Sequence, residues 1–219
     1  TGGDDDKNGK WHRLVKAIGE NQPTGVGGGS YGIGKGAPFV ASNLRAVYYS
    51  TKNKDGGFIF QGKARLFSHG CKWKEHRGIG FYGIQGYESI RKVSEIPAQF
   101  KRSEQGTDVN IIGYCVENGW MKGLVESVLE NFWMAIHCGD LEVAIIDGEN
   151  EIAINKTNLA DRLNEFSRER GLPYYRTVIA PTRVEKKPLP ILGVCSLYIK
   201  QEDGFPKDVV MMRKPKMKV

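Results

Sequence analysis

The chain carries a glycine-rich segment near its N-terminus, Gly25-Val26-Gly27-Gly28-Gly29-Ser30-Tyr31-Gly32-Ile33-Gly34-Lys35-Gly36-Ala37-Pro38-Phe39. Six of the ten residues from Gly27 to Gly36 are glycines, and glycine adopts positive φ freely and lets a ligand approach the backbone. An apolar run compatible with a helix, residues 37–44, follows directly. A glycine loop that opens into a helix presents unpaired backbone N–H groups at the positive end of the helix dipole, which favours phosphate. The segment therefore predicts a nucleotide phosphate site.

Three phosphate-loop templates compete for this segment. The Walker A pattern GxxxxGK[ST] nearly fits residues 29–36, with Lys35 in the lysine position, but Gly36 stands where the Ser or Thr belongs. Residues 20–24 are polar, whereas a P-loop follows a buried strand, and a Rossmann loop needs such a strand as well. The pattern GxxGxG, followed by a helix and an antiparallel hairpin, fits residues 29–34 and what comes after them. A flexible glycine linker is the remaining alternative, and the aromatic and apolar residues within the run argue against it.

Residues 29–39 resemble the third nucleotide motif of the GHKL superfamily, which includes DNA gyrase, heat-shock chaperones, histidine kinases and MutL and shares the Bergerat ATP-binding fold. The next segment, Leu44-Arg45-Ala46-Val47-Tyr48-Tyr49-Ser50-Thr51, is similar to the strand that follows this motif in the chaperone branch. A longer pattern, which includes Trp11 and Met211-Met212-Arg213, resembles uncharacterised prokaryotic proteins of the superfamily, some associated with phage defence. The resemblance is specific over residues 27–51, and beyond about residue 107 it rests on the order of elements.

The resemblance implies an ATPase module with ATP and magnesium as cofactors. Water would attack the γ-phosphate, and hydrolysis would time a conformational or dimerisation cycle, in phage defence or DNA transactions. The candidate catalytic cations are Lys35 and, from the transducer-type half, Arg213, with Lys207 and Lys214 as further candidates. The residues implied to hold the nucleotide phosphates are Gly29, Ser30, Tyr31, Gly32, Ile33, Gly34 and Lys35.

Two motifs of the family are not intact in this chain. The first carries the glutamate that activates water and the asparagine that holds magnesium, and the second is DxGxG, whose aspartate binds adenine. Thr1-Gly2-Gly3 fits the tail of the second motif, and the chain starts at Thr rather than Met. We therefore expect this chain to be part of a longer protein. By itself it is expected to bind ATP poorly and to hydrolyse it hardly at all.

The pattern of apolar residues predicts an α+β fold in two domains. The resemblance implies that the first, residues 1–105, is the C-terminal part of a Bergerat-type α/β sandwich, with the ATP lid and phosphate loop at residues 25–39. In the second, residues 106–219, the apolar pattern predicts helices on one face of a sheet, and the resemblance implies an α+β domain of the ribosomal S5-like transducer type. Apolar spacing predicts a helix over residues 120–137 that ends at Gly139, while residues 174–190 read as irregular.

The formal net charge of +7 leaves a second interpretation open. A non-catalytic nucleic-acid-binding module could use the basic aromatic segment 63–82 and the basic C-terminus, because basic residues interleaved with aromatic ones bind single strands. An irregular surface hairpin is the plainer interpretation of that segment. A scaffold with a degenerate ATP site is a third interpretation. Nucleotide, a homodimer formed on ATP binding and nucleic acid are thus the candidate partners.

The cysteines and the hydropathy bear on the cellular compartment of the protein, and they predict no metal site. Four cysteines lie far apart with no CxxC pair, which predicts buried free thiols in a reducing cytoplasm. His69, Cys71 and His76 are close together, but lysines and a tryptophan separate them, so no metal site is predicted. No apolar run is long enough to span a bilayer, and no secretory signal is present. We expect a cytoplasmic protein with no membrane partner.

Overall fold

The computed structural model describes residues 9–16, 33–190, 193–204, 207–213 and 216–218. The chain is mixed α+β, as the sequence predicts, and it divides into two compact units, Thr1–Val116 and Glu117–Val219. Each unit has buried clusters of its own.

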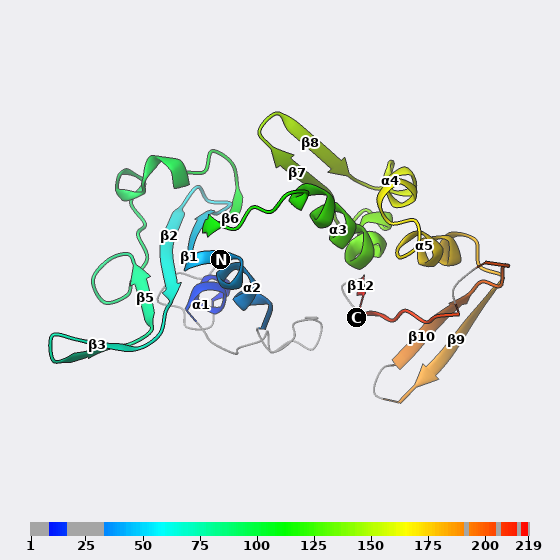
Figure 1. Cartoon of the computed structure of the whole chain (residues 1–219), viewed down its shortest axis with the longest axis horizontal. Coiled ribbons are helices and arrows are strands. Elements are labelled where there is room, and N and C mark those ends of the chain that lie inside the picture. Colours follow the sequence, from blue (N-terminus) through cyan, green and yellow to red (C-terminus); the bar gives the residue numbers. More distant parts are fainter. Residues whose placement is uncertain (1–8, 17–32, 191–192, 205–206, 214–215, 219) are drawn as a thin grey trace. The chain divides into compact units, whose positions relative to one another are not determined.

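The first unit is built on a four-stranded antiparallel sheet with the strand order β5-β2-β1-β6 (Figure 1). The strands are β1 (Ser42–Lys52), β2 (Phe58–Arg65), β5 (Ile79–Tyr82) and β6 (Gly106–Tyr114). β1 and β2 form the hairpin that the sequence predicts, since both strands contain runs of β-branched and aromatic residues, Val47–Tyr49 and Phe58–Phe60. A second, smaller hairpin of β3 (His69–Cys71) and β4 (Lys74–His76) lies between β2 and β5 in the chain.

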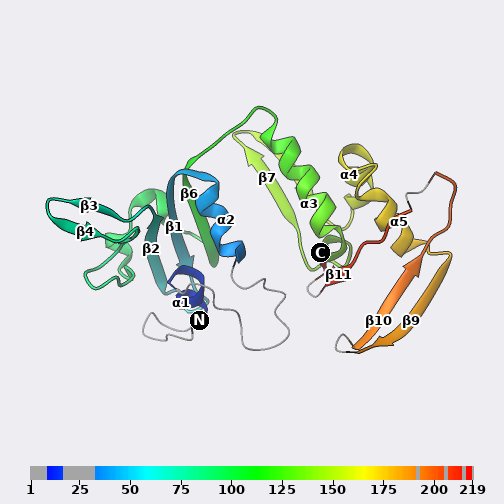
Figure 2. The same ribbon diagram turned by 60° about the horizontal axis from the view of Figure 1, so that its bottom comes forward.

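One face of this sheet is covered by short helices. They are α1 (Lys10–Val15), the 3₁₀ turn Ile33–Gly36 and α2 (Ala37–Val40), and Figure 2 shows α2 beside β1. Trp11 and Val15 of α1 and Phe39 of α2 pack against Val47 and Ile59 of the sheet. Trp11, expected in the core, is buried, and its Nε1 donates to Ser89 Oγ at 2.9 Å.

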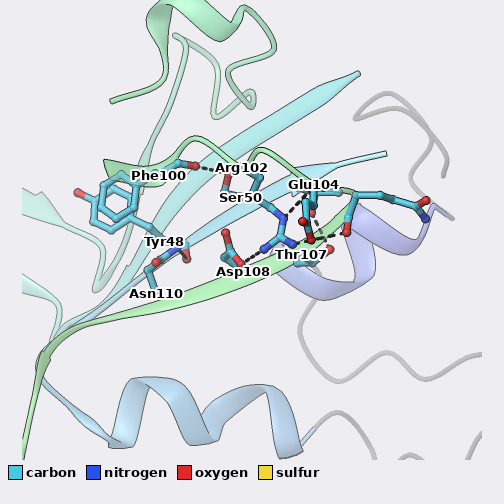
Figure 3. Close-up of polar contacts among 10 residues, drawn as sticks. Tyr48, Ser50, Phe100, Arg102, Glu104, Thr107, Asp108 and Asn110 are labelled. Carbon is cyan, nitrogen blue, oxygen red and sulfur yellow. Dashed lines mark hydrogen bonds and ion pairs between the residues drawn. The ribbon is translucent and has the colours of Figure 1, made fainter. Parts of the chain in front are cut away.

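Aromatic side chains cover the other face. Tyr48, Phe60 and Phe100 stack with ring centroids 5.0–5.7 Å apart, and Ser50 Oγ donates to the Phe100 carbonyl at 2.6 Å. Figure 3 shows Arg102, just after this stack, pointing at the carboxylate of Asp108 on β6, with which it forms an ion pair. These contacts hold the 3₁₀ turns Val93–Glu95 and Ala98–Phe100 against the sheet.

The dividing point between the units differs from the expected one. The sequence placed it after residue 105, with residues 106–219 as one domain, whereas the structure places it after Val116. The reason is that β6 pairs with β1 over most of its length, so this strand completes the sheet of the first unit.

The second unit begins with α3 (Trp120–His137), whose bounds match the predicted helix, and Gly139 follows it at φ +78°. Val125, Leu129 and Trp133 of α3 form the centre of the core with Ile154 and Leu163. The elements that follow are β7 (Val143–Asp147), β8 (Asn150–Ile154), α4 (Leu159–Phe166), α5 (Leu172–Ile179), β9 (Arg183–Leu189), β10 (Gly193–Ile199), β11 (Met212–Arg213) and β12 (Met217–Lys218).

Two expectations for this unit are wrong. Its described strands form three separate two-stranded ladders, β7-β8, β9-β10 and β11-β12, rather than one sheet with helices on a face. Residues 174–190 are also not irregular, because they contain most of α5 and all of β9. Pro173 lies in the first turn of α5, where proline is tolerated, and Pro188 lies in a two-stranded ladder, where every strand is an edge.

The cysteines are free, as expected, but they are not buried: Cys71, Cys115 and Cys138 are exposed, and Cys195 is half-buried. The first three lie on the β3–β4 hairpin, just after β6 and at the C-cap of α3, where little packs over them. None of the helices in the described ranges is both long enough and apolar enough to cross a membrane.

Candidate phosphate site

The predicted phosphate loop is only partly within the described residues. Gly29, Ser30, Tyr31 and Gly32 lie outside them. Ile33, Gly34 and Lys35 form a 3₁₀ turn with Gly36, and this turn runs directly into α2. The predicted helix after the glycines is therefore present, but α2 ends at Val40, because the chain enters β1 at Ser42.

Lys35 lies against the end of α1. Its Nζ donates to the carbonyl oxygen of Arg13 at 2.7 Å, and the side chain is half-buried. A lysine at this place compensates the partial negative charge at the C-terminus of a helix. The Lys35 ammonium is thus held beside the end of α1. In the chain, residues 17–32 between Lys16 and Ile33 lie outside the described residues.

A second lysine, Lys63 of β2, reaches the same helix end. Only 4 % of Lys63 is exposed, and its Nζ donates to the carbonyls of Val15 at 2.5 Å and Lys16 at 3.5 Å. Sequence reasoning placed Lys63 in the basic aromatic segment 63–82 and missed its burial. The signal was the period of two along β2, which puts Lys63 on the same sheet face as Ile59, the face that packs against α1.

Arg65 completes the group from the next position on that face. Its guanidinium carbon lies 4.6 Å from the centroid of the Phe39 ring. One guanidinium nitrogen also lies 3.7 Å from where a Cβ on Gly36 would be, so Arg65 is next to the turn that precedes α2. We call Lys35, Lys63 and Arg65 the basic cluster.

The positive charges of the basic cluster lower the pKa of Lys63, its most buried residue. The pKa of Lys63 is lowered to about 8, first by burial and then by the positive charges of Arg65 and Lys35. No acidic group is among these causes. Three cations held close together repel one another, and an anion bound among them would remove that repulsion. The arrangement therefore suits phosphate.

The second predicted catalytic residue, Arg213, belongs to the other unit. It lies in β11, where its backbone pairs with Met217. Of its two alternatives, Lys207 is exposed and Lys214 lies outside the described residues. Lys35 and Arg213 therefore come from different units of the chain.

The ammonium and guanidinium groups of the basic cluster can donate hydrogen bonds to phosphate oxygens, but they cannot bind magnesium. Across the described ranges, no group of three or more His, Cys, Asp or Glu side chains could hold a metal ion. His69 and His76 do lie opposite each other on the β3–β4 hairpin, with ring centroids 5.4 Å apart.

Comparison with known proteins gave no match: no family model, no curated protein and no solved structure matches the chain.

Proposed function

We propose that this chain supplies the phosphate-binding part of a GHKL-type ATPase module, which binds and hydrolyses ATP with magnesium and drives a conformational or dimerisation cycle. In this proposal the first unit is the C-terminal part of a Bergerat-type domain, and the second is the transducer-type domain. The proposal extends to the setting that the resemblance implies, phage defence or DNA transactions in a prokaryotic cytoplasm.

The observation that carries the proposal is the basic cluster. Lys35 follows the glycine-rich segment directly, and Lys63 and Arg65 approach the same place from β2. Lys35 is held by the Arg13 carbonyl and adds its positive charge to that of Lys63 and Arg65. The glycine segment and the cluster are therefore complementary parts of one anion site.

In this proposal the residues of the chain stabilise the negative charge on the phosphate oxygens. Phosphoryl transfer is catalysed chiefly by positioning and by cations that neutralise charge on the phosphate oxygens. Lys35 and Arg65 supply fixed positive charge, and Lys63 supplies it in a place shielded from water, where each charge acts more strongly. In the proposal, Arg213 contributes to the rate rather than to nucleotide binding.

The test is the titration of a fluorescent ATP analogue with magnesium into the longest native form of the protein and into its Gly32→Val and Lys35→Ala variants, because this chain by itself is expected to bind ATP poorly. A hydrogen bond to a charged group contributes about 1.5–3 kcal/mol, so each variant should bind about ten- to a hundredfold more weakly. Lys54→Ala is the matched control, because Lys54 is exposed in the β1–β2 turn. Equal binding by the parent and both site variants, or no binding by the parent, would contradict the proposal.

A rate measurement separates binding from hydrolysis. Arg213→Ala should leave the affinity for the analogue unchanged and lower the rate of phosphate release. A change in affinity without a change in rate would contradict the role proposed for Arg213.

A further inference from the structure

A second surface of the first unit lies far from the core, at the β3–β4 hairpin. Figures 1 and 2 show this hairpin extending away from the sheet at the end of β2. All six residues of its two strands are exposed. The hairpin therefore adds little to the hydrophobic core of the unit.

The turn of this hairpin has an unusual composition for its geometry. Cys71 pairs with Lys74, so the loop consists of Lys72 and Trp73 alone. Their φ angles are +48° and +65°, and two-residue loops of this kind favour Asn-Gly, because positive φ is unfavourable for residues with a Cβ. The sequence thus places a bulky side chain where the turn itself would favour glycine.

That bulky side chain is fully exposed. The relative exposure of Trp73 is 105 %, the highest among the exposed large apolar residues of the described ranges. Water around an indole ring is unfavourable, and no packing in the hairpin compensates for it. Tryptophan at this position is unfavourable both for the backbone of the turn and for the hydration free energy of its ring. We infer from this that the ring contacts a partner.

The neighbours of Trp73 indicate what kind of partner. Lys72 and Lys74 lie on either side of it and are exposed, and Arg77 follows β4. Gly70, opposite Glu75, has no side chain, which leaves a shallow open hollow of about 380 Å³ beside the ring. Trp73 is the only large apolar residue at the tip, between Gly70 and Arg77, while the exposed Leu66 and Phe67 precede β3 at the opposite end of the hairpin. Insertion into a lipid bilayer would call for several apolar side chains, whereas one flat ring between cations suits a base and its phosphates.

We propose that the tip of the β3–β4 hairpin binds single-stranded nucleic acid, with Trp73 stacking on a base and Lys72 and Lys74 contacting the flanking phosphates. Stacking on an aromatic ring does not depend on which base is present, so the contact is not sequence-specific. The basic cluster takes no part in it, and this inference does not depend on the proposed ATPase activity.

The test is fluorescence anisotropy of a labelled 20-nucleotide oligothymidylate, measured without nucleotide on the whole protein. Trp73→Ala should weaken binding about tenfold or more, and Trp73→Phe should keep most of the affinity. Lys72→Ala combined with Lys74→Ala should make the slope of log K against log salt shallower by about 1.4, because each of the two phosphate contacts contributes about 0.7 on single strands. Lys54→Ala, which removes an exposed lysine in another turn, should change binding less than twofold.

A second variant separates binding from folding. Lys72→Asn with Trp73→Gly installs the sequence that the turn geometry favours, so the hairpin should be as stable as in the parent or more so. Binding should nevertheless fall at least as far as in Trp73→Ala, because the variant lacks both the ring and the Lys72 ammonium. ATP-analogue binding should be unchanged in all hairpin variants, so failure of this inference and failure of the ATPase proposal are distinguishable.

Three results would overturn the inference. One is equal oligonucleotide affinity for Trp73→Ala and the parent. Another is an equal loss in the Lys54→Ala control, which would mean that net charge alone binds the strand. The third is dependence on Trp73 for binding to phosphatidylserine vesicles but not to the oligonucleotide, which would make the tip a membrane contact.

Discussion

Lys63 is the residue at which the fold and the proposed function meet most closely. It lies on the buried side of β2, where the alternating pattern would favour an apolar residue, and it is nonetheless a lysine. Its ammonium caps the end of α1 through Val15 and Lys16, while Arg65 and Lys35 add positive charge nearby. A buried cation among cations lowers stability, and a bound anion, as proposed, would offset that loss.

The first prediction concerns stability against pH. The pKa of Lys63 is about 8 in the folded protein, against an ordinary value of 10.5. Between these values the unfolded chain binds more protons than the folded one, so the contribution of Lys63 to the free energy of unfolding rises with pH. Relative to Lys63→Met, the parent should gain roughly 2 kcal/mol between pH 7.5 and pH 9.5. Urea denaturation of both proteins at the two pH values measures this, and a constant difference would refute the prediction.

The second prediction concerns a glycine with no room for a side chain. A Cβ on Gly62 would lie 2.5 Å from Tyr48 Cε1 and 2.9 Å from Tyr82 Cβ, within the aromatic face of the sheet. Gly62→Ala should therefore lower the free energy of unfolding of the first unit by about 1–3 kcal/mol. Gly80→Ala on the neighbouring strand β5 is the control, since a Cβ there meets nothing within 4 Å. Equal urea midpoints for the two variants would count against this account.

At the scale of elements, α3 organises the second unit. Leu129 is fully buried on its core face, whereas Leu124, on the same helix, is 42 % exposed. Leu129→Ala should lower the free energy of unfolding by about 2–5 kcal/mol, because the removed side chain leaves a cavity. Leu124→Ala should have an effect below about 1 kcal/mol. Similar denaturation midpoints for the two variants would show that α3 does not pack as described.

The elements also show what a sequence can predict. The helix α3 was predicted to the residue, because its apolar positions follow a period of 3.6 over five turns and Gly139 ends it. α5 and β9 were missed, because three prolines made residues 174–190 read as irregular. Pro173 starts a helix and Pro188 is tolerated in an edge strand, which only tertiary context decides.

The candidate site stays a prediction. Lys35 was singled out as a phosphate ligand from its place among the glycines, whereas the contact of its Nζ with the Arg13 carbonyl was not predicted. Lys63 and Arg65 were assigned to a nucleic-acid surface, because a local motif gives no information on which distant helix covers a strand. The role of Arg213 stays a prediction, since it depends on the second unit.

At the scale of the whole molecule, the two units have separate cores, and the basic cluster comes from the first unit alone. A ligand stabilises what it binds, by about 2.7 kcal/mol at a hundred times its dissociation constant. Mg·ATP should therefore slow hydrogen exchange of the core amides of β1 and β2 by up to about a hundredfold and leave those of α3 unchanged.

This last prediction has a control and a contrary outcome within one experiment. At the same Mg·ATP concentration, the Lys35→Ala variant should show a slowing of only about two- to tenfold, because its affinity for the nucleotide is expected to be about ten- to a hundredfold lower. Slower exchange in α3 as well would mean that the nucleotide stabilises both units. Residues of the second unit, Arg213 foremost, would then contribute to binding itself rather than to the rate alone. Slower exchange confined to β1 and β2 would support binding of the phosphates by the first unit alone, as proposed.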